Sequence, residues 1–102
     1  MTEKTKPTSD ELFAFLNDLL GKHQMRLEKG RDWFICRKHT GLLGFLMNFF
    51  DGDSIGWIVT GEPYRIDAYG DSIFWEKIVR LTKERFDIQI SYMPIRGEFI
   101  GS

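Results

Sequence analysis

Two pairs of short alternating segments constrain the fold of this chain more than any other feature of its sequence. The first pair covers residues 25–27 and 33–36 around Gly30, and the second covers 55–59 and 64–69 around Gly61. Alternation of apolar and polar residues indicates strands, and glycine-containing turns between such strands indicate hairpins. The sequence therefore predicts a mostly antiparallel sheet.

Two segments with helical character surround the first hairpin. Thr8 and Glu11 match a capping box, in which each side chain bonds the backbone of the other, and apolar residues then recur at helical spacing as far as Gly21. Residues 42–50 are apolar almost all round, a pattern typical of a buried helix. We expect one helix before the hairpin and one after it.

The clearest helix follows the second hairpin, at residues 73–86, and residues 88–92 alternate as a last strand that Pro94 should end. The predicted order is α-β-β-α-β-β-α-β. Hairpins with interspersed helices indicate an α+β domain, with the helices packed on one face of the sheet. We expect six residues in the core: Phe74, Ile78, Leu81, Ile35, Ile66 and Ile90.

The size and composition of the chain predict a single domain. Its 102 residues, 42% hydrophobic and 15% aromatic, can form one core, which we place at residues 8–95 between flexible tails at 1–7 and 96–102. The single cysteine, Cys36, excludes an intrachain disulfide and fits a reducing compartment. The longest apolar run, 42–50, is too short to span a membrane. We expect a cytoplasmic protein with no membrane partner.

The charges are sorted along the chain although the net charge is only −1. Residues 22–39 contain six Lys or Arg against two Asp or Glu, whereas residues 40–74 contain one against five. These segments either form a binding face or neutralise each other as solvated stretches. We favour mutual neutralisation.

One loop comes close to the calcium-binding loop of an EF-hand. Such a loop needs oxygen ligands at positions one, three and five, glycine at six and glutamate at twelve. With Asp51 at position one, Asp53, Gly56 and Glu62 fall at three, six and twelve. Position five is Ile55, which has no side-chain oxygen, and a strand pattern follows where a second helix is needed. We expect a helix-to-strand turn and no calcium site.

Cys36 and His39 could contribute to a zinc site together with His23 and a carboxylate. On a strand, however, residues three apart point to opposite faces, and the chain has no further Cys or His. The same pair lacks an orienting group that would make it a nucleophile and base. We expect a buried, unreactive cysteine and no zinc.

Several carboxylates fall at turns and strand ends, where they could include an acid and base pair. No His, Ser or Lys accompanies them in a recognisable arrangement, so we expect no enzyme and keep a hydrolase-like activity only as a third hypothesis. These residues are Asp51, Asp53, Glu62, Asp67 and Asp71.

The basic segment 22–39 interleaves cations with Trp33 and Phe34, as platforms for single-stranded nucleic acid do. Its two aromatic residues should point to opposite faces of a strand, and the isoelectric point near 6.1 is low for a nucleic-acid-binding domain. We therefore expect a small protein-binding or regulatory domain, without cofactor, that can form a homodimer, and nucleic-acid binding is the alternative. The predicted binding residues are Arg26, Arg31, Arg37, Lys38, Trp33 and Trp57.

Overall fold

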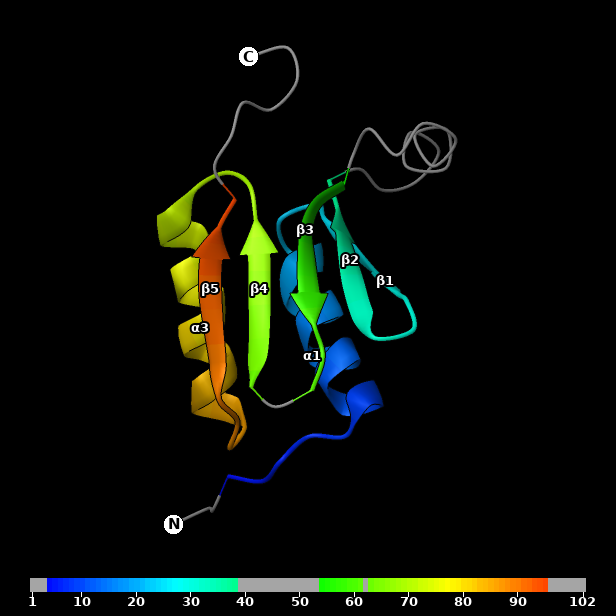
Figure 1. The fold of residues 1–102 in the computed structure, drawn as a ribbon, viewed down its shortest axis with the longest axis vertical. Coiled ribbons are helices and arrows are strands. Elements are labelled where there is room, and N and C mark those ends of the chain that lie inside the picture. The colour runs from blue at the N-terminus through cyan, green and yellow to red at the C-terminus, as the bar shows by residue number, and fades with distance from the viewer. Residues whose placement is uncertain (1–3, 39–53, 62, 96–102) are drawn as a thin grey trace.

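The computed structural model describes residues 4–38, 54–61 and 63–95. Five strands form one sheet in the order β1-β2-β3-β4-β5, and two helices lie on the same side of it, behind the sheet in Figure 1. The strands are β1 (Arg26–Lys29), β2 (Trp33–Arg37), β3 (Ser54–Val59), β4 (Tyr64–Ala68) and β5 (Ile90–Pro94), and the helices are α1 (Ser9–Gly21) and α3 (Ser72–Arg85). This confirms a small α+β domain. The predicted helix at 42–50 lies outside the described residues.

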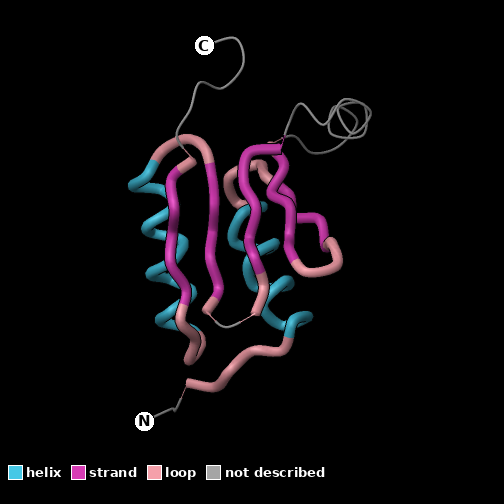
Figure 2. Tube along the Cα trace, in the orientation of Figure 1, coloured by secondary structure: helices cyan, strands magenta, loops and turns pink. Residues whose placement is uncertain are grey.

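The pairing of the strands follows from their connections. The first four strands pair antiparallel, as the two hairpins predict. β4 and β5 are parallel because α3 carries the chain back along the sheet between them, which Figure 2 shows on the left. The sheet is therefore mostly antiparallel, with a parallel strand at one edge. No helix in the described part of the chain is long and apolar enough to cross a membrane.

Both helices begin at side-chain caps. The Thr8 hydroxyl accepts a bond from the Glu11 amide at 3.1 Å, and the Glu11 carboxylate accepts one from the Thr8 amide at 2.9 Å, so the predicted capping box is confirmed. Asp71 caps α3 by accepting from the Ile73 amide at 2.9 Å. The carboxylate of Asp71, one of those considered for catalysis, thus has a structural partner.

The core lies between the helices and the sheet. Gly56 allows this close packing, because a Cβ atom there would lie 3.1 Å from that of Ala68 and 3.6 Å from the Trp75 ring. The indole of Trp75 also donates to the Tyr69 carbonyl oxygen at 3.1 Å. The most buried side chains come from α1, α3 and the strands between them: Leu12, Leu16, Leu20, Trp75, Ile78, Phe34, Cys36, Ile58 and Ile66.

The core prediction was right for Ile78, Ile66 and Ile90, which are buried, and in part for Phe74, which packs against the core; it was wrong for Ile35 and Leu81. Ile35 lies on the face of the sheet away from the helices, because β2 turns Phe34 and Cys36 inward. Phe74 and Leu81 are only half-buried. The buried stripe of α3 is instead Trp75, Ile78 and Thr82, whose hydroxyl donates to the Ile78 carbonyl oxygen at 2.7 Å.

Candidate functional site

The face of the sheet away from α1 and α3 is the candidate site, and we call it the open face. Strand register aligns Glu28, Ile35, Trp57, Asp67 and Met93 in one row that crosses all five strands. A second row contains Trp33, Val59, Arg65 and Ser91. Strands alternate their side chains between two faces, so these residues share the face opposite the buried core.

The open face exposes large apolar side chains. Met93 is 56% exposed, Trp33 41% and Val59 36%, while Trp57 and Ile35 between them are half-buried. The Trp57 ring meets the Tyr69 ring edge-on, with 6.3 Å between centroids. Exposed Trp, Met and aliphatic side chains on one face are typical of the centres of protein interfaces.

Ionic contacts border this apolar surface on β1 and β2. Glu28 accepts from Arg26 at 2.6 Å and from the Arg37 Nε at 2.8 Å. Arg37 is nearly buried, 7% exposed, and also donates to the Ser54 hydroxyl at 3.0 Å, which the register shift between Cys36 and Arg37 places beside it. The hydrogen bond from Arg26, assisted by Arg37, lowers the pKa of Glu28 even though partial burial opposes this. Glu28 thus remains ionised and holds both guanidinium groups.

A second ion pair lies on β4. Arg65 donates to both carboxylate oxygens of Asp67, at 2.8 and 2.9 Å, a bidentate geometry that also raises the pKa of Arg65. Asp67 stands between Trp57 and Met93 in the row that crosses the sheet. Asp67, which was also considered for catalysis, is therefore paired with a cation on the open face.

The structure separates the cations that the sequence grouped together. Arg26 and Arg37 face each other across the hairpin and converge on Glu28. Arg31 lies in the β1–β2 turn, and Lys38 follows the opposite end of β2. Both are exposed. The basic segment is thus spread along the whole hairpin.

The two tryptophans, by contrast, come together. Trp33 and Trp57 lie on neighbouring strands and on the same face. Sequence reasoning missed Met93 and Glu28, and it considered Asp67 for catalysis and not as part of the open face. Alternation alone could have placed Glu28 with Arg26, but Met93 joins the site only through the parallel β4–β5 pairing.

The groups considered for metal binding or nucleophilic chemistry do not form a centre in the described part of the chain. Burial raises the pKa of the Cys36 thiol to about 12, and its sulfur lies 4.0 Å from that of Met25. No cluster of three potential metal ligands occurs among the residues that the structure describes. His39, Asp51, Asp53 and Glu62 lie outside them.

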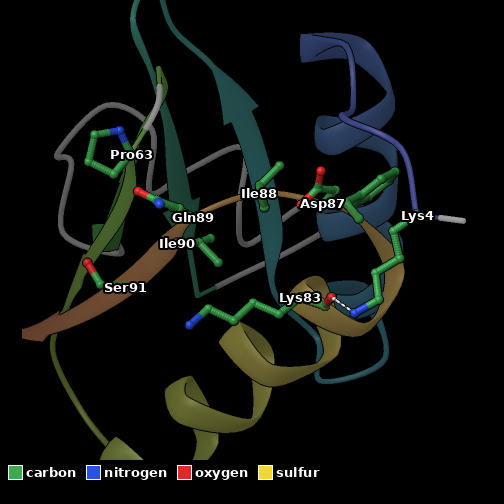
Figure 3. Close-up of a pocket in the computed structure, with 9 residues that line it drawn as sticks. Lys4, Pro63, Lys83, Asp87, Ile88, Gln89, Ile90 and Ser91 are labelled. Carbon is green, nitrogen blue, oxygen red and sulfur yellow. Dashed lines mark hydrogen bonds between the residues drawn. The ribbon is translucent and has the colours of Figure 1, made fainter.

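A separate cleft of about 560 Å³ lies where α3 connects to β5 (Figure 3). The Lys4 ammonium closes one end by donating to the Lys83 carbonyl oxygen at 2.9 Å, and the Asp87 amide donates to the Thr5 carbonyl oxygen at 2.9 Å. The N-terminal residues 4 and 5, which the sequence placed in a flexible tail, thus contact this connection. Its walls carry two lysines and one carboxylate, Asp87, without a nucleophile and base in contact.

Comparison of the chain with known protein families, with curated proteins and with solved structures gave no match.

Proposed function

We propose that this protein is a non-enzymatic binding domain whose open face docks onto an apolar surface of another protein. The exposure of Trp33, Val59 and Met93 on one rigid sheet face is the observation that carries the proposal. Burying such side chains gives most of the binding free energy at protein interfaces, and tryptophan is prominent among the residues that dominate it. The Glu28 ion pairs on β1 and β2 provide a polar border on one side, and the Arg65–Asp67 pair adds a polar contact within the face.

The pairing of the cations supports a protein partner over a nucleic acid. Binding to phosphates draws on guanidinium and ammonium groups that are available to replace counterions. Arg26 and Arg37 share Glu28, and Arg65 binds Asp67 at both oxygens. Arg31 and Lys38 are exposed and lie at opposite ends of β2, away from the paired arginines.

The state of the reactive groups supports binding in preference to catalysis. A thiol whose pKa is raised by burial is neutral at physiological pH and a poor nucleophile. Asp67 and Asp71 are engaged by Arg65 and by the start of α3. A single buried thiol also suits a reducing compartment, and we propose that the protein works in the cytoplasm.

A photo-crosslinking amino acid placed at Val59 tests the open face in the native host. We expect ultraviolet light to give a protein adduct that disappears when Trp33→Ser is added, because the substitution removes the most exposed ring of the face. The same amino acid at Ala14, exposed on α1, is the matched control and should give no adduct. Equal adducts from both positions, or none from Val59, would contradict the proposal.

The nucleic-acid alternative is tested with a labelled single-stranded oligothymidine. Fluorescence anisotropy at near-physiological salt should show no saturable binding, and any binding at low salt should weaken steeply as salt is added. Tight binding that falls with Arg31→Ala and Lys38→Ala, but not with Trp33→Ser, would replace the protein partner with a nucleic acid.

A further inference from the structure

The two edges of the sheet differ in how well they are protected against further pairing. On β1, three of four residues are charged, and the outward Leu27 amide donates to the Asn17 side chain of α1 at 3.0 Å. Lys29 also forms an ion pair with Asp10 of that helix. β5 carries no charged residue, and it has a neighbour on one side only among the described strands. Charges, proline and covering side chains are the usual protection of edge strands; among the described residues β5 has only Pro94 at its end and the lysines of the cleft, Lys4 and Lys83, near its start.

The backbone of β5 shows which groups point away from the sheet. The Gln89 carbonyl oxygen accepts from Tyr64 at 2.8 Å, and the Ile95 amide donates to Ala68 at 2.9 Å. Backbone groups of a strand alternate in direction, so those of Ile90 and Tyr92 point to the outer edge. Pro94 points outward too but has no amide hydrogen. The outer edge thus offers a donor and an acceptor at each of two alternate residues.

We propose that β5 pairs antiparallel with β5 of a second copy of this chain, which joins the two sheets into one. A two-fold axis beside Ser91 places Ile90 of each copy opposite Tyr92 of the other, and each of these residues then donates and accepts once. A register centred on Tyr92 would place Ile90 opposite Pro94 and lose a donor from each copy. The uncharged sequence of β5 puts no like charges opposite each other in this pairing.

The charges on α3 favour a second copy as the occupant of this edge. Phe74 contacts His23 near the end of α1, with 4.9 Å between ring centroids, so that flank of α3 faces α1. Glu76 and Lys83 lie on the opposite flank, two turns apart, and both are exposed. Lys83 lines the cleft of Figure 3 together with Ile90, which places this flank beside the outer edge of β5.

The two-fold axis makes these charges complementary. Pairing of β5 with its copy sets the two α3 helices side by side and antiparallel, since α3 runs back along β5. Glu76 of one copy then faces Lys83 of the other, and the reverse pair forms on the other side of the axis. A foreign strand would satisfy the backbone of β5 but would meet these charges without matching ones.

A charge swap tests the proposal by sedimentation velocity over a wide range of protein concentrations. We expect a reversible dimer in the wild type. Glu76→Lys should raise its dissociation constant by about tenfold or more, because it places like charges across the axis. Adding Lys83→Glu to that variant should restore the dimer, while Glu84→Lys, the same charge change on the solvent side of α3, should leave it unchanged.

A thiol at the axis tests the register. In the proposed pairing the two Ser91 residues are direct, non-hydrogen-bonded neighbours, a spacing of about 4.5 Å between Cα atoms that suits a disulfide. Ser91→Cys should therefore oxidise rapidly to a covalent dimer, and Ala14→Cys should not. Cys36 does not compete, because it is buried with a raised pKa. A wild type that stays monomeric at all concentrations, a double swap that fails to restore the dimer, or equal oxidation of both cysteine variants would overturn the proposal.

Discussion

The two faces of the sheet contain similar residue types but differ in what covers them. On the helix-covered face, Phe34, Ile58 and Ile66 are almost completely buried against α1 and α3. On the open face, Trp33, Trp57 and Val59 occupy the alternate positions of the same strands and keep part of their surface in solvent. Apolar content therefore does not separate the core of this protein from its candidate binding surface, and only the position of the helices does.

The largest expected effect is the difference in stability between matched truncations on the two faces. Ile66→Ala should lower the free energy of unfolding by about 2–5 kcal/mol, because the side chain is fully buried and its removal leaves a cavity. Val59 lies on the neighbouring strand and points to the open face, so Val59→Ala should lower the free energy of unfolding by less than about 1 kcal/mol. Urea unfolding followed by tryptophan fluorescence measures both. Equal losses would mean that the open face is covered in the folded protein.

The next effect concerns the ion pairs that border the open face. Glu28→Gln should destabilise the fold by about 1–3 kcal/mol, because the nearly buried Arg37 loses the carboxylate that it contacts at 2.8 Å. Glu84→Gln is the control, because Glu84 and Arg80 are 3.9 Å apart and both side chains are exposed. The same urea titration should show almost no change for this control. If Glu28→Gln lowered the free energy of unfolding no more than Glu84→Gln does, the Glu28–Arg37 pair would not stabilise the open face.

The same carboxylate predicts a dependence of stability on pH. A folded-state pKa below the ordinary value means that folding favours the ionised form, so this stabilisation is present above the ordinary pKa of about 4.3 and is lost as the pH falls further. Measured from neutral pH to pH 3, the gap in unfolding free energy between wild type and Glu28→Gln should narrow on the acid side. A gap that is constant with pH would assign the effect to shape and not to charge.

The smallest effect is expected on the helix-covered face, at a polar atom. The hydroxyl of Tyr92 is buried, and it has no hydrogen-bond partner among the described residues. Tyr92→Phe removes an unsatisfied group without changing the packed ring, so stability should stay the same or rise by about 1 kcal/mol. Thermal unfolding measures the change. A clear loss would reveal a partner for the hydroxyl, and Tyr64→Phe on the adjacent strand provides the comparison.

Sequence patterns predicted elements of this fold better than they predicted its surfaces. Alternation around Gly30 and Gly61 gave four strands and their antiparallel pairing, and the Thr8–Glu11 spacing gave the start of α1. The interpretation failed where both alternating sets of residues are apolar. In Trp33-Phe34-Ile35-Cys36 the pattern allows either alternating set to face the helices. We assigned Ile35 to the core, but Phe34 and Cys36 occupy it.

What the sequence determined by itself is local: turns, caps and the periods of two and 3.6 residues depend on neighbours along the chain. What the tertiary structure decided is non-local. The packing of Trp75 onto Gly56 set which face of β3 is buried, and Arg37 met Glu28 and Ser54 only when three strands paired. The parallel pairing of β5 likewise brought Met93 to the open face and left Ile90 and Tyr92 at the edge. A period shows that residues alternate between two sides, but only packing shows which side excludes water.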